Sequence, residues 1–147
     1  MKKVVSFLLI IFVLFSFTSC SAEKIKIDDC EWKMSTIMSN DAQLADSEDV
    51  VIAVGEPDDI YPNATVVNIT LTASNGKITV TDKTNNQVYY GGYKVTQNTP
   101  RGTDYEIEIN GQNGYATVAQ TKHYSGEEIP TLPINLGEYT IYFIPNK

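Results

Sequence analysis

Apolar and polar residues alternate along much of the chain after residue 30, and this pattern predicts β strands. The clearest example is residues 64–74, where every second residue from Val67 to Ala73 is apolar. The dipeptide Asn75-Gly76 follows and favours a tight two-residue turn, because both positions of such a turn require positive φ. Residues 77–81 then alternate again, so this part of the chain is predicted to form a hairpin.

The same reasoning gives about nine short strands, separated by turns that are rich in Gly, Pro, Asn and Asp. From residue 20 onward the chain has 9 Val, 13 Ile and 14 Thr, side chains that fit a pleated sheet better than a helix. The acidic segment 39–49 is predicted to be a loop, and a turn is predicted at residues 111–113. Pro133 predicts that its strand lies at an edge or starts late. The predicted strands are residues 30–38, 50–54, 64–74, 77–81, 88–96, 105–110, 114–122, 131–136 and 138–144.

Short strands that follow one another through tight turns favour an antiparallel meander. The predicted fold is therefore all-β, with eight to nine strands in an up-and-down barrel. A β-sandwich is the alternative, because the longer connections at residues 41–49 and 55–63 can supply the return connection of a Greek key.

The first 19 residues have the composition of a secretory signal peptide. Lys2 and Lys3 precede 14 mostly apolar residues, 4–17. This length fits the apolar region of a signal peptide and is shorter than the ~20 residues of a membrane-spanning helix.

Small residues follow this segment and offer two cleavage sites. Residues 17–20, Phe-Thr-Ser-Cys, resemble the lipobox of bacterial lipoproteins. The resemblance implies that Cys20 is acylated and anchors the chain to the outer side of a bacterial cell membrane. The alternative is ordinary cleavage after Ala22, which releases a secreted protein.

These boundaries divide the chain into a signal peptide (1–19), a short tether (20–29) and a single all-β domain (30–147). Acylation or removal of Cys20 leaves Cys30 without an obvious partner, so the domain is expected to fold without an internal disulfide. A Cys20–Cys30 disulfide requires that both thiols survive unmodified.

The charge of the chain excludes some function classes. The formal net charge of −7 argues against binding to nucleic acid, which favours a basic surface. One His and two Cys are too few for a His-rich or Cys-rich zinc site. Two acidic groups in predicted loops offer oxygen ligands for Ca²⁺, but they lack the spacing of an EF-hand, so no metal and no cofactor is predicted. These groups are Asp46, Glu48 and Asp49, and Glu56, Asp58 and Asp59.

Several short sequences resemble a known family. Glu31-Trp32-Lys33-Met34 begins the first predicted strand, and Gly91-Gly92-Tyr93-Lys94 lies in mid-chain. With the all-β meander, they resemble the lipocalin-like domains of small secreted bacterial lipoproteins. Residues 71–77 (LTASNGK) and 81–86 (TDKTNN) also resemble lipoproteins of low-GC Gram-positive bacteria. The resemblance implies a small eight-stranded barrel that holds an apolar ligand and has no catalytic residues.

Aromatic residues are the candidate ligand-binding residues. Trp32 lies on the first predicted strand, and Tyr89, Tyr90 and Tyr93 surround Gly91-Gly92, where missing side chains permit a close approach or a bulge. Their flat apolar faces and polar tips suit a sugar, a peptide or the mouth of a barrel. The alternative is that Tyr serves as the bulky filler of a core with little Phe.

Residues that suggest catalysis carry less weight. Glu106 and Glu108 share one face of a strand, and paired carboxylates perform glycoside hydrolysis. The simpler interpretation is that they form the solvent face opposite Ile107 and Ile109. His123 is the only His, and no Gly-x-Ser-x-Gly motif accompanies it, so no catalytic residue is predicted.

The sequence therefore predicts a non-catalytic, membrane-anchored domain. Two binding modes remain open, a small apolar molecule inside a barrel or a partner on its surface. The alternative is a carbohydrate- or protein-binding sandwich of the adhesin type, and a hydrolase ranks last.

Overall fold

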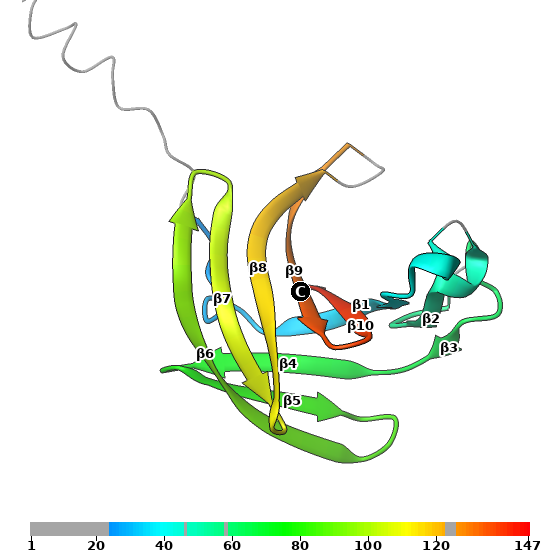
Figure 1. The fold of residues 1–147 in the computed structure, drawn as a ribbon, viewed down its shortest axis with the longest axis horizontal. Coiled ribbons are helices and arrows are strands. Elements are labelled where there is room, and N and C mark those ends of the chain that lie inside the picture. Colours follow the sequence, from blue (N-terminus) through cyan, green and yellow to red (C-terminus); the bar gives the residue numbers. More distant parts are fainter. Residues whose placement is uncertain (1–23, 46, 58, 123–125) are drawn as a thin grey trace, which may run out of the picture.

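The computed structural model describes residues 24–45, 47–57, 59–122 and 126–147. They form ten β strands, and two short 3₁₀ helices, Ala42–Leu44 and Glu48–Val50, precede the second strand (Figure 1). The strands are β1 (Trp32–Ser39), β2 (Val51–Val54), β3 (Thr65–Val66), β4 (Ile69–Ser74), β5 (Lys77–Asp82), β6 (Gln87–Thr99), β7 (Gly102–Ile109), β8 (Gln112–Lys122), β9 (Glu128–Leu136) and β10 (Tyr139–Pro145).

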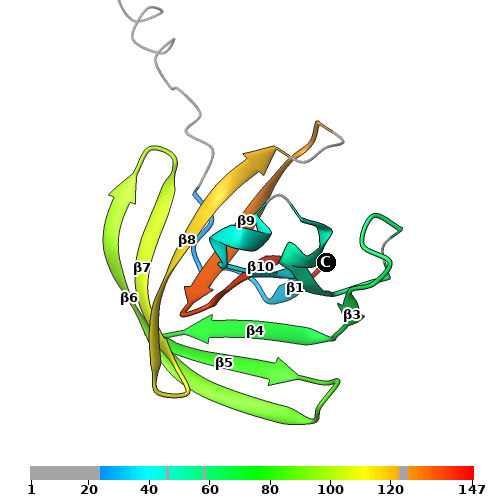
Figure 2. The ribbon, with the colours of Figure 1, turned by 45° about the vertical axis from the view of Figure 1, so that its right-hand side comes forward.

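Eight of these strands close into an antiparallel barrel. From β4 to β10 each strand pairs with the next along the chain, and β1 pairs with both β10 and β4 to complete the ring (Figure 2). The prediction of an all-β up-and-down barrel is confirmed, and the sandwich alternative is wrong. The long connection after β1 forms two extra strands, β2 and β3, outside the ring.

Asn-Gly turns set the register of two hairpins. Asn75 and Gly76 have φ of 50° and 76°, so the predicted hairpin turn between β4 and β5 is confirmed. The turn between β7 and β8 is Asn110-Gly111, with φ of 53° and 80°. Our placement of this turn at residues 111–113 is therefore wrong, because the same Asn-Gly signal lies one residue earlier.

Pro133 does not place its strand at an edge, which corrects the prediction. β9 begins at Glu128 and lies between β8 and β10, and Pro133 is paired with Tyr142 of β10. On the other side, the ladder to β8 is interrupted between Thr131 and Ile134. The strand therefore accommodates the missing N–H of proline by omitting ladder positions on one side only.

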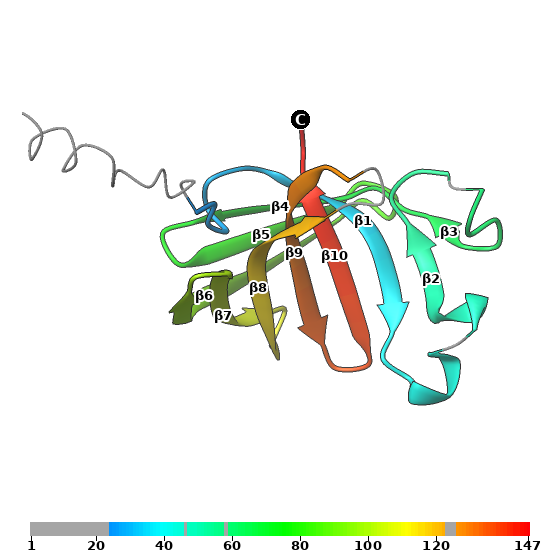
Figure 3. The same cartoon turned by 90° about the horizontal axis from the view of Figure 1, so that it is seen from above.

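We name residues 40–68 the insertion. Its described part, which includes β2 and β3, lies beside β1 and away from β6 and β7 (Figure 3). The first half of β1 pairs with β4 at Trp32 and Lys33, and its second half pairs with β2. Gly55 lies against the bulge of β1, and a Cβ atom there would meet the Met34 carbonyl oxygen at 2.1 Å. The segment 39–49, predicted to be a loop, contains the first 3₁₀ helix and most of the second, which ends at Val50. The strand predicted at residues 50–54 is confirmed as β2, which begins one residue later.

Inward-facing side chains from all eight barrel strands form one core. Its largest fully buried members are Trp32 of β1, Tyr105 of β7 and Phe143 of β10. Strand β6 contributes Tyr89 and Tyr93, which are half-buried and pack against the core. Each large side chain that is fully buried stabilises the fold by about 1.5–3 kcal/mol. The other buried barrel residues of the core are Met34, Leu71, Ile78, Val80, Ile107, Ile109, Ala116, Val118, Leu132 and Ile134.

Strand β6 forms a corner of the barrel at Gly91-Gly92. Its residues 87–92 pair with β5 and its residues 91–99 pair with β7, so the strand bends where the two ladders overlap (Figure 1). A Cβ atom on Gly91 would lie 1.8 Å from the Glu108 carbonyl oxygen. The close approach predicted at this pair is therefore confirmed for Gly91, whose missing side chain allows the bend.

We expect Gly91→Ala to lower the free energy of unfolding by about 1–3 kcal/mol, because the new methyl group must displace the backbone of β7. Gly92→Ala is the matched control, since its Cβ would meet only the Gly76 carbonyl oxygen, at 3.2 Å. Urea unfolding monitored by circular dichroism measures both variants. Equal stability of the two would contradict the proposed corner.

Candidate functional site

The predicted aromatic site is divided between the inside and the outside of the barrel. Trp32 is fully buried, and Tyr89 and Tyr93 point inward from β6 and are half-buried. Tyr90 points outward and is 70% exposed, because successive residues of a strand face opposite sides. The four residues therefore do not form a single binding surface.

The N-terminal segment, residues 24–31, folds back onto the interior. Ile27 is fully buried in the core. The indole Nε1–H of Trp32 donates a hydrogen bond to the Ile27 carbonyl oxygen at 2.8 Å, and the Ile27 N–H donates to the Tyr105 hydroxyl at 3.2 Å. The prediction that residues 20–29 form a tether is therefore wrong for Ile27, which packs inside the barrel at the end where β1 begins.

Two tyrosines complete this end of the interior. The rings of Tyr93 and Tyr105 meet edge to face, with centroids 5.8 Å apart and an interplanar angle of 72°. Burial raises the pKa of both hydroxyls above its ordinary value. Among the described residues, no buried side-chain nitrogen or oxygen lacks a hydrogen-bond partner. The indole N–H of Trp32 and the hydroxyl of Tyr105 are thus both hydrogen-bonded within the protein.

Cys30 precedes β1 and is a half-buried, free cysteine. Burial raises the pKa of its thiol, and the neighbouring Asp29 carboxylate raises it further. A raised pKa lowers the thiolate fraction at neutral pH, so Cys30 is a weak nucleophile. Its predicted alternative partner, Cys20, lies outside the described residues.

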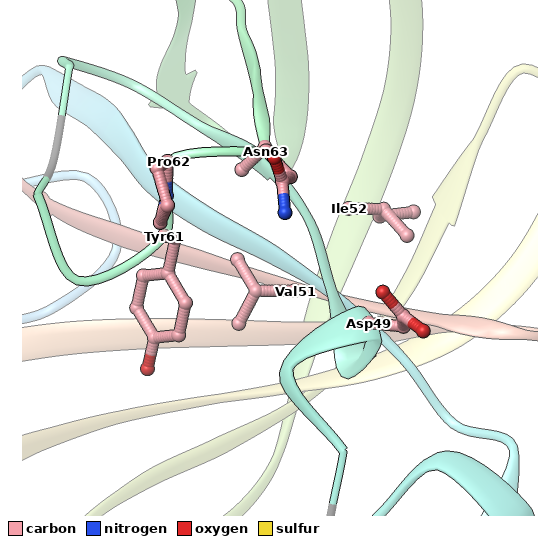
Figure 4. Close-up of a pocket in the computed structure, with 7 residues that line it drawn as sticks. Asp49, Val51, Ile52, Tyr61, Pro62 and Asn63 are labelled. Atoms are coloured by element: carbon pink, nitrogen blue, oxygen red, sulfur yellow. The ribbon is translucent and has the colours of Figure 1, made fainter.

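The three clefts that can be described open outside the barrel wall. The first, which we name the edge cleft, has a volume of about 300 Å³ and lies between β2 and the turn that leads to β3. In Figure 4, Val51 lies between Tyr61 and Asp49, and the Asn63 side chain extends from the turn toward Val51 and Ile52. The residues that line the edge cleft are Asp49, Val51, Ile52, Tyr61, Pro62, Asn63 and Ala64.

The second cleft is a groove of about 460 Å³ between β1 and the segment after β2. The Lys33 ammonium and the Glu56 carboxylate form an ion pair across it at 2.8 Å. The hydrogen bond and the positive charge of Lys33 lower the pKa of the Glu56 carboxyl. Asp59 and Ile60 also line this groove, so acidic and apolar side chains lie together along it.

The third cleft, also about 460 Å³, lies between the end of β1 and the β9–β10 turn. The Asn40 side chain donates to the Gly137 carbonyl oxygen at 3.1 Å and accepts from the Thr140 hydroxyl at 2.7 Å. The Asn40 N–H donates to the Glu138 carbonyl oxygen at 2.8 Å. These bonds hold the two segments together, so we assign this cleft a structural role.

The insertion combines exposed apolar side chains with acidic charge. Ile52, Ile60 and Val66 are 39%, 66% and 48% exposed. In the sequence, no Lys, Arg or His occurs between Lys33 and Lys77. Seven acidic residues lie in that interval, and they are Asp41, Asp46, Glu48, Asp49, Glu56, Asp58 and Asp59.

The carboxylates considered for hydrolysis lie on the outer wall. Glu106 and Glu108 alternate with the buried residues Ile107 and Ile109 along β7, as the simpler interpretation predicted. Glu108 also accepts a hydrogen bond from the Gly111 N–H and so closes the β7–β8 turn.

Several other candidates yield no site in the described part of the chain. No group of three or more His, Cys, Asp or Glu within it is arranged to hold a metal ion. Asp46, Asp58 and His123 lie outside the described residues. Within the described ranges, no helix is long and apolar enough to cross a membrane.

Comparisons with known proteins found no matching protein-family model, curated protein or solved structure. The candidate site is therefore defined by the geometry and the charge of the chain alone.

Sequence reasoning missed two features of the site. Within the insertion, the sequence predicts two loops, the strand 50–54 and the start of the strand 64–74, whereas the structure divides the latter strand into β3 and β4. The interval without basic residues includes the whole insertion and was the signal that sets it apart. Ile27 was assigned to a tether, although Ile25 and Ile27 alternate with charged residues and thus indicate one buried face.

We expect Ile27→Ala to lower the free energy of unfolding by about 2–5 kcal/mol, because it leaves a cavity beside Trp32. The matched control is Ile25→Ala, which truncates a half-buried residue of the same segment and should cost clearly less. Urea unfolding of both variants is the measurement. If Ile27→Ala proves as mild as the control, residues 24–31 are a tether and not part of the core.

Proposed function

We propose that this chain is a non-catalytic binding domain that holds a protein partner through the outer surface of its insertion. The observation that carries the proposal is the contrast between the two sides of the barrel wall. Trp32, Tyr105 and Phe143 are fully buried inside, whereas Ile52, Ile60 and Val66 are exposed on the insertion.

The interior is a poor site for an apolar ligand. Large side chains that point into the barrel, among them Trp32, Tyr105 and Phe143, are fully buried there. Ile27 packs against the same core from one end of the barrel. Of the two binding modes that the sequence leaves open, these buried side chains therefore favour a partner on the surface.

The insertion has the properties of a recognition segment. It leaves the meander between two strands of a rigid barrel, and binding residues commonly lie on such connections. Its clefts bring apolar side chains together with carboxylates, the combination that gives both contact area and specificity.

The proposal includes an anchor and excludes catalysis. Acylation of Cys20, expected from the lipobox resemblance, would hold the domain on the outer side of a bacterial membrane, where the insertion can meet other macromolecules. The outward position of Glu106, and the use of Glu108 to close a turn, favour a role in folding over hydrolysis.

A photo-crosslinking residue tests the binding surface in the cells that make the protein. We expect p-benzoylphenylalanine at position 60 to capture a distinct protein, because Ile60 is exposed beside both acidic and apolar residues. The matched control carries the same residue at Tyr90, which is equally exposed but lies on the barrel wall.

The captured chain is then analysed by mass spectrometry. An adduct to one protein from position 60 and none from position 90 supports the proposal. Equal capture from both positions, or a small apolar molecule retained by the unmodified chain, contradicts it. The same mass spectra identify the N-terminal residue of the mature chain. Acylated Cys20 is the expected result, and an unmodified Glu23 at the N-terminus would contradict the anchor.

A further inference from the structure

We propose that the edge cleft binds an extended segment of a partner protein that is both basic and apolar, and that this segment pairs with β2 as an added strand. The inference rests on the proposed function, since it names the class of partner that the insertion would hold.

The first argument is an open strand edge. A closed barrel leaves its strands paired on both sides, so edges arise only where strands lie outside the ring. β2 pairs with β1 on one side, and on the other side its parallel ladder with β3 joins Ala53 to Thr65 and Val54 to Val66. Among the described residues, this ladder does not extend to Val51 and Ile52.

The edge cleft lies where that ladder stops. The Ala64 N–H donates to the Tyr61 carbonyl oxygen at 3.1 Å, so residues 61–64 form a turn before β3 begins. Val51 and Ile52 line the cleft on the β2 side, and Tyr61 and Pro62 line it on the turn side (Figure 4). A volume of about 300 Å³ suits a short extended segment, which would pair at the usual strand spacing of ~4.8 Å.

The second argument is the chemistry of the cleft wall. Strand addition takes its affinity from main-chain hydrogen bonds and its specificity from pockets for alternate side chains. Ile52, which is exposed, and Tyr61 line the cleft and offer an apolar contact for one side chain of the segment. Asp49 adds a carboxylate to the same cleft wall. An alternation of apolar and basic residues matches this wall.

The third argument is charge complementarity. The interval between Lys33 and Lys77 has seven acidic and no basic residues, and the Lys33 ammonium is already paired with Glu56. A cationic segment is therefore attracted to the insertion, and an acidic one is repelled. The same repulsion disfavours a second copy of this chain, whose insertion has the same charge.

A labelled peptide of seven alternating Lys and Val residues, with blocked ends, tests the inference by fluorescence anisotropy with the mature chain. We expect this peptide to bind saturably. A control peptide of alternating Lys and Gly should bind at least tenfold more weakly, and one of alternating Glu and Val should not bind. Methylation of alternate peptide nitrogens retains the charge but removes main-chain donors, so it should weaken binding at least tenfold as well.

Two variants locate the site. Ile52→Lys places a cation on the open edge and should weaken peptide binding at least tenfold. Val88→Lys adds the same charge on the barrel wall and should change binding less than twofold. It is a matched control because Val88 is 46% exposed and Ile52 is 39% exposed. Circular dichroism confirms that both variants fold.

The outcomes separate this inference from the proposed function. Equal binding of the methylated peptide, or equal weakening by the two variants, overturns strand addition at β2. Absence of peptide binding together with capture of a protein from position 60 overturns the inference and leaves the proposed function standing. A dimer that Ile52→Lys dissociates would assign the edge to a second copy and would also overturn the inference.

Discussion

Strand β1 belongs both to the closed barrel and to the sheet that the insertion forms, and the rest of the molecule depends on how its pairing is divided between them. One of its edges pairs along its whole length with β10. The other edge pairs with β4 at Trp32 and Lys33, and with β2 from Thr36 onward. Trp32 therefore contributes both to the ladder that closes the ring and, through its buried indole, to the core inside it. The short β1–β4 ladder leaves an edge on which the insertion can form.

Under the proposed function, this division separates stability from recognition. The barrel buries its large side chains and pairs its strands around a closed ring, so a change on the insertion need not disturb it. The strands β2 and β3 of the insertion lie at one side of the molecule (Figure 3). The sequence of the insertion is acidic, and its side chains Ile52, Ile60 and Val66 are exposed. A rigid scaffold with a variable connection is a common way to build a binding site, because loops tolerate changes that a core does not.

Local patterns predicted most of the fold, because hairpins depend on residues that are close in sequence. The alternation of residues 67–73 and the Asn75-Gly76 turn gave the β4–β5 hairpin, and the same turn signal at Asn110-Gly111 would have corrected the β7–β8 turn. Pairing of β1 with β10 joins the two ends of the domain, and no local pattern specifies it.

The candidate site was less predictable than the fold. Alternation alone separates Tyr90 from Tyr89 and Tyr93, so the sequence could have shown that these tyrosines face different sides. It could not show that the Trp32 indole would donate a hydrogen bond to the Ile27 carbonyl oxygen, or that the β2–β3 ladder would begin only at Ala53, because both depend on tertiary packing.

The fluorescence of Trp32, the single tryptophan of the chain, tests most directly whether the barrel interior is occupied by the protein itself. The mature chain is titrated with acrylamide and, separately, with apolar fluorescent probes such as cis-parinaric acid. A filled interior predicts blue-shifted emission that resists acrylamide and does not change with the probes. Saturable quenching of Trp32 by one probe molecule per chain would mean that the barrel holds a ligand, and the binding surface would then lie inside it and not on the insertion.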